Sequence, residues 1–268
     1  MGKVIGEALL FFHIGGMLFR ILVIGLAYVL SVAVPQAEEK PFHVSLVGDR
    51  YDGEAWHTGV LVSLAPGWKT YWRMPGEAGI PPEFTWSSSV PAEVEVLYPA
   101  PSRHTDESGE AVGYERAVLF PVTVRAGGVT DVELNLDLFL GVCKDICIPA
   151  NAQASITLGP LMKDIAGAAQ VEDALSLVPV PGTAITSAEL VRGGGKPELL
   201  LNLDARPDDI FVEAPGPAYF HAPVFSPDGR QARLAIDNLK DASQLAGAVA
   251  KITYRIAGQG FEQSMTLP

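Results

Sequence analysis

The chain has 268 residues, of which 48% are hydrophobic and 19% charged, and its net charge is −12. The apolar fraction is large enough for a sizeable core and excludes wholesale disorder. The acidic balance argues against a nucleic-acid partner, because the phosphate backbone is bound by Lys and Arg. The 27 Gly and 21 Pro are too many for a helical bundle and are typical of all-β chains with many turns.

The most apolar stretch lies near the N-terminus and has the order of a secretory signal peptide. Arg20 precedes an apolar run over residues 21–34, and small residues follow it. The run is shorter than the ~20 apolar residues of a spanning helix. Residues 1–37 are therefore predicted to be a cleaved leader, with a retained N-terminal anchor as the alternative, and Met17 would give a more compact start. Outside the cytoplasm a cysteine pair can stay oxidised.

From residue 41 onward, short apolar runs alternate with turn residues, which predicts a β-sandwich. The cleanest strand covers residues 132–140, where Val and Leu alternate with Glu, Asn and Asp until Phe139. Residues 161–177 have apolar side chains near helical spacing and predict a connecting helix.

Short strands resume after residue 181, with a predicted hairpin over residues 187–203. The expected organisation is an all-β chain with two β-sandwich domains. The first covers residues 38–160, a helical linker covers 161–180, and a second sandwich without cysteines covers 181–268.

Cys143 and Cys147 are the two cysteines of the chain, and they follow the cleanest strand. Two cysteines are too few for a disulfide scaffold or a four-ligand zinc site, and the histidines lack metal-site spacing. A disulfide across so short a loop removes little unfolded-chain entropy, and a small ring near the surface is easier to reduce. The spacing alone leaves a redox-active pair and a structural disulfide in a β-turn both open.

Several motifs occur in one order across residues 41–158. They are PGWKTYW (66–72), PGEAGIPP (75–82), PAP (99–101), GY (113–114), FPV (120–122) and GVCKDICIP (141–149). Together they resemble the N-terminal periplasmic domain of the thiol:disulfide interchange protein DsbD family, and more closely its ScsB-like branch. Residues 181–268 resemble the second β domain of ScsB-type periplasmic regions.

The resemblance implies an immunoglobulin-like fold for the sandwiches and a thiol–disulfide oxidoreductase activity that needs no cofactor. It makes Cys143 and Cys147 the reactive pair, with Cys147 bonded to partners and Cys143 resolving. It also implies a cap loop near residues 103–114. Tyr114 would be the capping aromatic, and Asp106 and Glu107 would lie in the loop, for which a solvated acidic loop is the plainer interpretation.

The expected partners are thioredoxin-like periplasmic proteins. Full-length members also carry a membrane transporter and a terminal thioredoxin domain, which this sequence lacks, so a separate membrane electron transporter is expected as a partner. The CxxxC spacing is shorter than in the best-known DsbD but fits the ScsB-like branch. The expected location is the periplasm, with anchoring to the inner membrane as the alternative. The competing hypothesis is a non-catalytic exported binding module with a structural disulfide.

Overall fold

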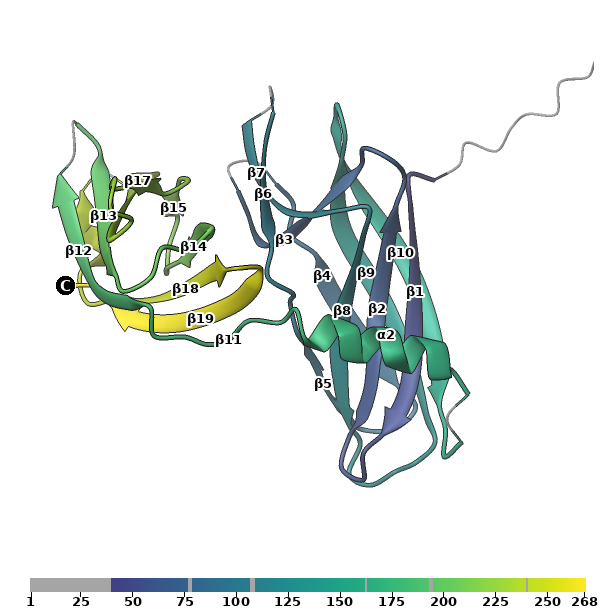
Figure 1. Ribbon diagram of the computed structural model, residues 1–268. Coiled ribbons are helices and arrows are strands. Elements are labelled where there is room, and N and C mark those ends of the chain that lie inside the picture. The colour runs from purple at the N-terminus through teal and green to yellow at the C-terminus, as the bar shows by residue number, and fades with distance from the viewer. Residues whose placement is uncertain (1–39, 77–78, 107–108, 162, 193–194, 240) are drawn as a thin grey trace, which may run out of the picture. The chain divides into compact units, whose positions relative to one another are not determined.

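The computed structural model describes residues 40–268, apart from 77–78, 107–108, 162, 193–194 and 240. The predicted leader, residues 1–37, lies outside this part. The described residues form four sheets with one α-helix, which confirms the all-β class (Figure 1). Among them, no helix has the length and hydropathy of a membrane span.

Two sheets form what we call the first sandwich. One has the strand order β1-β2-β8-β5, with bounds Phe42–Tyr51, Trp56–Leu64, Ala117–Arg125 and Glu93–Val96. The other has the order β10-β9-β3-β7-β6, with bounds Cys147–Leu158, Val132–Cys143, Lys69–Gly76, Gly109–Glu115 and Ser102–Asp106. In this second sheet β4 (Glu83–Ser88) also pairs with β9.

Strand β9 shows why the first sandwich has a well-defined core. Its alternation of apolar and polar residues directs one face inward, and the buried members are Val132, Leu134, Leu136, Leu138 and Leu140. The strand continues to Cys143, beyond the predicted end at residue 140, since Gly141 and Val142 are buried as well. The alternation of buried and exposed residues therefore ends at Leu140, and the residues from Gly141 to Cys143 are all buried.

The remaining two sheets form the second sandwich, which has its own cluster of buried residues. One sheet has the order β11-β19-β18-β14, with bounds Val180–Pro181, Gln259–Thr266, Val249–Ile256 and Asp209–Glu213. The other has the order β12-β13-β17-β15, with bounds Ile185–Arg192, Pro197–Leu203, Gln231–Asp237 and Tyr219–Phe220. A short β16 (Val224–Phe225) also pairs with β17, and a 3₁₀ turn covers Ala242–Leu245. The predicted hairpin is the antiparallel pair β12–β13.

The helix α2 (Ile165–Leu175) lies within the predicted helical segment. It does more than connect, because it packs against β1, β2 and β8 of the first sandwich (Figure 1). Small residues permit a close approach: a Cβ built on Gly167 would lie 2.5 Å from the backbone nitrogen of Gly48 in β1. The N-cap residue Asp164 accepts hydrogen bonds from the backbone N–H groups of both glycines. Helix and sheet are thus joined at the helix N-terminus.

Candidate redox site

The two cysteines close the end of the β9–β10 hairpin. The strands pair antiparallel from Val132 opposite Leu158 up to Cys143 opposite Cys147, and a disulfide joins the last pair. The turn between them holds Lys144, Asp145 and Ile146, all exposed. The register brings the two cysteines face to face, so the fold and not the short loop alone sets up the bond.

The two sulfur-bearing residues differ in their access to solvent. Cys143 is 7% exposed and ends the buried face of β9, whereas Cys147 is exposed at the start of β10. The apolar neighbours Ile146 and Ile148 are 73% and 37% exposed. A protein partner can therefore reach Cys147 beside exposed apolar side chains, while Cys143 faces the interior.

Tyr71 of β3 is the aromatic residue that contacts the pair. Its hydroxyl oxygen lies 3.0 Å from the Sγ of Cys147. Because a disulfide sulfur carries no hydrogen, the tyrosine hydroxyl is the donor. Tyr71 itself is 3% exposed. The buried ring thus presents one polar atom to the exposed cysteine.

Two glycines make room for the Tyr71 ring. A Cβ built on Gly141 would lie 2.9 Å from the ring, and one built on Gly79 would lie 2.5 Å from it. Real Cβ atoms do not approach other atoms so closely, so side chains at these positions would displace the ring. The family-like motifs that contain Gly79 and Gly141 therefore have a physical role in holding Tyr71 beside the cysteines.

Strand β3 also supports β9 next to the tip of the hairpin. Lys69 and Thr70 pair with Cys143 and Val142 of β9. The hydroxyl of Thr70 donates a buried hydrogen bond of 2.9 Å to the carbonyl oxygen of Gly141. The strand pairing and the Thr70 hydrogen bond thus hold β9 in place next to Cys143.

The turn before β3 comes close to the cysteine loop. Gly67 has a φ of +81°, in the left-handed region that favours glycine. A Cβ at that position would lie 3.3 Å from the Cε of Lys144. The Pro66-Gly67 turn therefore lies beside the tip of the hairpin.

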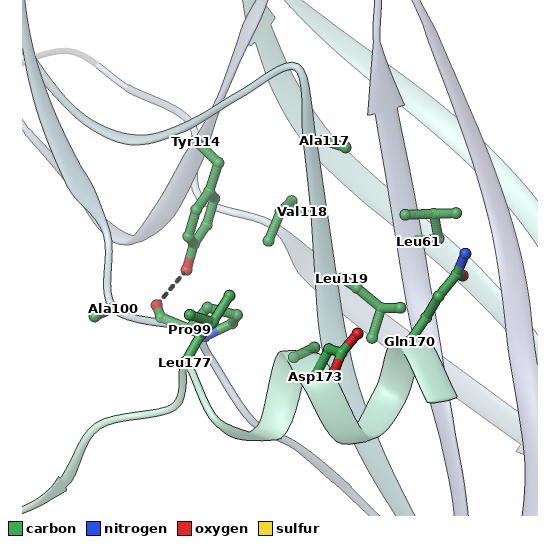
Figure 2. A pocket seen from close by; sticks show the side chains of 11 residues that line it. Leu61, Pro99, Ala100, Tyr114, Ala117, Val118, Leu119, Gln170, Asp173 and Leu177 are labelled. Carbon is green, nitrogen blue, oxygen red and sulfur yellow. Dashed lines mark hydrogen bonds between the residues drawn. The ribbon is translucent and has the colours of Figure 1, made fainter. Parts of the chain in front are cut away.

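Tyr114 occupies a different place from the one predicted. It is 8% exposed, its ring contacts Phe120 edge to face at 5.5 Å, and its hydroxyl donates to the carbonyl oxygen of Pro99 at 2.8 Å. Burial raises the pKa of its phenol well above the usual value. Figure 2 shows the side chain in the wall of a pocket that Val118 and Leu177 also line. Tyr114 is a core residue and does not cap the disulfide.

The two acidic residues of the predicted cap fall at the end of the β6–β7 hairpin. Asp106 is the last residue of β6 and pairs with Gly109 of β7. Glu107 lies outside the described residues. The predicted place of these two residues in a cap therefore stays a prediction.

The first sandwich matches a known family. Residues 33–158 match the family model described as "Thiol:disulfide interchange protein DsbD, N-terminal". The first sandwich is therefore a domain of the DsbD N-terminal family. Its hairpin carries the Cys143–Cys147 disulfide, which relates the chain to thiol:disulfide interchange. No curated protein is similar enough to the chain to count as a match.

The likeness to a solved structure extends beyond the DsbD N-terminal domain. The crystal structure of the N-terminal periplasmic domain of ScsB from Proteus mirabilis superposes with a TM-score of 0.67 and 24% sequence identity. The match covers 83% of this chain and 91% of that chain. At this identity the likeness shows a shared fold, and its coverage includes strands on both sides of α2.

The sequence predicted the cysteine pair but not its tyrosine. Tyr71 and its neighbour Trp72 are both buried, as aromatic residues of a strand commonly are. The missing information is the contact across 76 positions between Tyr71 and Cys147. The two glycines that flank its ring are the one signal that could have pointed to a tightly held aromatic.

Proposed function

We propose that the protein is a periplasmic thiol:disulfide interchange protein that relays reducing equivalents to or from thioredoxin-like partners through Cys143 and Cys147. The observation that carries this proposal is the unequal exposure of the pair, with Cys147 exposed and Cys143 at 7%. A structural disulfide has no need of an accessible sulfur, whereas an exchanging one must admit a partner thiolate in line with its S–S bond.

The exchange proceeds in two balanced steps. A partner thiolate attacks the Sγ of Cys147, a mixed disulfide forms, and Cys143 leaves as a thiolate. The second cysteine of the same partner then attacks, as a thiolate, the partner sulfur of the mixed disulfide and releases Cys147 as a thiolate. The partner dithiol becomes a disulfide, the Cys143–Cys147 bond becomes two thiols, and two electrons have moved. Each step is reversible, so the pair can also pass electrons onward.

The environment of Cys147 suits its part in this exchange. The Tyr71 hydroxyl, 3.0 Å from the sulfur, can donate to the negative charge that develops when the mixed disulfide is resolved. The exposed Ile146 and Ile148 offer apolar contact to a partner next to the reacting atom. The similar ScsB structure is described as a periplasmic domain, which supports an exported location, and a separate membrane electron transporter would supply or withdraw the electrons.

Trapping of a mixed disulfide tests the proposal. A thioredoxin-like protein with a single active-site cysteine, activated with thionitrobenzoate, is mixed with the Cys143→Ser or the Cys147→Ser variant. The Cys143→Ser variant, which keeps the exposed Cys147, should form the covalent complex at least tenfold faster. Equal rates, or faster trapping by Cys147→Ser, would contradict the assigned order of attack.

Equilibration with reduced thioredoxin-like protein tests the relay itself. The unaltered chain should lose its disulfide as the partner is oxidised, in a one-to-one ratio. A pair that resists reduction, with a potential below about −300 mV, would identify a structural disulfide and support the binding-module hypothesis instead.

A further inference from the structure

Strand β3 connects the cysteine pair to the second sandwich through consecutive residues. Tyr71 contacts Cys147. The next residue, Trp72, has no exposed surface, and its ring meets that of Phe211 of β14 at a centroid distance of 5.8 Å and an interplanar angle of 62°. Such an edge-to-face contact between buried rings has a defined geometry, so the backbone beside Tyr71 is held by a side chain of the second sandwich.

Arg73, the residue after Trp72, makes the polar half of this connection. Its Nε donates to Oε2 of Glu213 at 3.0 Å and its Nη2 to Oε1 of Glu213 at 2.8 Å, while Nη2 also donates to Oε2 of Glu262 at 2.7 Å. The arginine side chain is 22% exposed. Burial alone would lower the pKa of Arg73, but the hydrogen bonds and charges of the two glutamates outweigh it, and the pKa is raised. The guanidinium therefore stays charged and binds the carboxylate of Glu213 through two hydrogen bonds.

Phe211 is held from a second direction by Arg103 of β6. Phe211 has no exposed surface and belongs to the core of the first sandwich, although its strand belongs to the second. The Arg103 guanidinium lies 4.9 Å from the Phe211 ring and donates to the carboxylate of Asp209 and the carbonyl oxygen of Ile210. Two arginines of the first sandwich, Arg73 and Arg103, thus bind residues of β14.

Regular backbone pairing of β3 with β7 ends at Tyr71 and resumes at Gly76. The pairs of β3 with β9 are at Lys69 and Thr70. Its pairs with β7 run through Tyr71 and resume at Gly76, with an irregular register between. Within the described part of the chain, residues 72–75 have no regular ladder partners on either side. Contacts with Phe211, Glu213 and Glu262 therefore help to hold Trp72 and Arg73 in place.

We infer that the second sandwich sets the redox properties of the cysteine pair, with Phe211 and Glu213 as positioning residues that act through Tyr71. This deepens the proposed function and rests on it. When Phe211 and Glu213 hold β3, the Tyr71 hydroxyl stays within bonding distance of Cys147 and stabilises the thiolate of the reduced form. Loosening β3 weakens that bond and shifts the equilibrium toward the disulfide.

The experiment measures the equilibrium constant of the full chain with glutathione redox buffers. Glu213→Gln removes the negative charge that pairs with Arg73. Phe211→Leu removes the ring contact with Trp72 while keeping an apolar side chain. Each should favour the disulfide by about three- to tenfold, which lies within the range of indirect coupling. The matched control is Glu198→Gln, which breaks an exposed 3.2 Å pair with Arg233 in the second sandwich and should leave the constant unchanged.

A double-mutant cycle with Tyr71→Phe separates positioning from general loosening. If Glu213 acts through Tyr71, Glu213→Gln has no further effect in the Tyr71→Phe background. The inference is overturned if Glu213→Gln and Phe211→Leu leave the constant unchanged, or if their effects persist in full beside Tyr71→Phe. Glutathione replaces the protein partner here, so this result stands apart from any failure of the relay to thioredoxin-like proteins.

Discussion

The hydroxyl of Tyr71 donates to the sulfur of Cys147 across 76 positions of sequence, at 3.0 Å. The donor is part of a buried ring and the acceptor is an exposed residue of a hairpin tip. This places a rigid hydrogen-bond donor behind the sulfur that a partner attacks from solvent in the proposed exchange.

Replacement of Tyr71 by Phe should favour the disulfide by about tenfold, which for this two-electron couple is ~30 mV toward more negative potential. A hydrogen bond to a charged acceptor contributes ~1.5–3 kcal/mol, enough for such a change. The measurement is the thiol–disulfide equilibrium with glutathione. Tyr51→Phe, which loses an exposed bond to the carbonyl of Gly53, is the control. A potential equal to that of the unaltered chain would rule out a role for the hydroxyl.

Loss of the disulfide should cost little stability. The cysteines are four positions apart, and the chain-entropy relation gives about 2 kcal/mol for so small a loop. The Cys143→Ser, Cys147→Ser double variant should therefore remain folded, with a free energy of unfolding lower by at most that amount in urea titrations. A loss of 4 kcal/mol or more would indicate that the bond serves the fold.

Replacement of Arg103 by Ala should be among the most destabilising changes. The side chain is 9% exposed and pairs with Asp209 and Glu110, and its removal takes the positive charge of Arg103 away from two largely buried carboxylates, at a cost of about 3–5 kcal/mol. Arg233→Ala, which breaks an exposed pair with Glu198, should cost less than ~1 kcal/mol. Urea unfolding compares the two, and similar losses would show that the Arg103 cluster contributes no more than a surface pair.

Asp164 should make α2 sensitive to acid. Hydrogen bonds from the backbone N–H groups of Gly48 and Gly167 lower the pKa of Asp164 below its usual 3.8. A lowered folded-state pKa stabilises the fold above the unfolded-state value, and this contribution is lost as pH falls through the folded-state pKa. Asp164→Ala should cost about 1 kcal/mol at neutral pH, and the gap to the unaltered chain should narrow below pH 3.8. A gap that stays constant down to pH 2 would exclude ionisation of Asp164 as its source.

The sequence was most informative where the chemistry is local. The alternation along residues 132–140 predicted β9, and the cysteines beyond it could be assigned to the end of that strand. The helical spacing before Leu177 predicted α2. These features depend on neighbours within a few positions, which any single sequence displays.

Contacts between distant strands were not predictable in the same way. Tyr114 was assigned to a cap by the family resemblance, yet its side chain points to the core beside Phe120. Tyr114 lies opposite Thr70 in the β3–β7 ladder, one position from Tyr71, so the two tyrosine side chains face opposite sides of the sheet. Periodicity along a single strand carries no information on this pairing. The insertion of Phe211 into the core of the first sandwich is likewise a matter of tertiary packing.

The β9–β10 hairpin has a consequence for the lifetime of the mixed disulfide. Its strands, each of 12 residues, hold Cys143 opposite Cys147 through an unbroken ladder. In the proposed exchange, Cys143 therefore keeps a high effective concentration next to the Cys147 sulfur after their bond opens. The Cys143 thiolate can attack the Sγ of Cys147, re-form the Cys143–Cys147 disulfide and release a stalled partner as a thiolate. In cells, covalent complexes of the unaltered chain should accordingly be fleeting, and they should accumulate once Cys143 is removed.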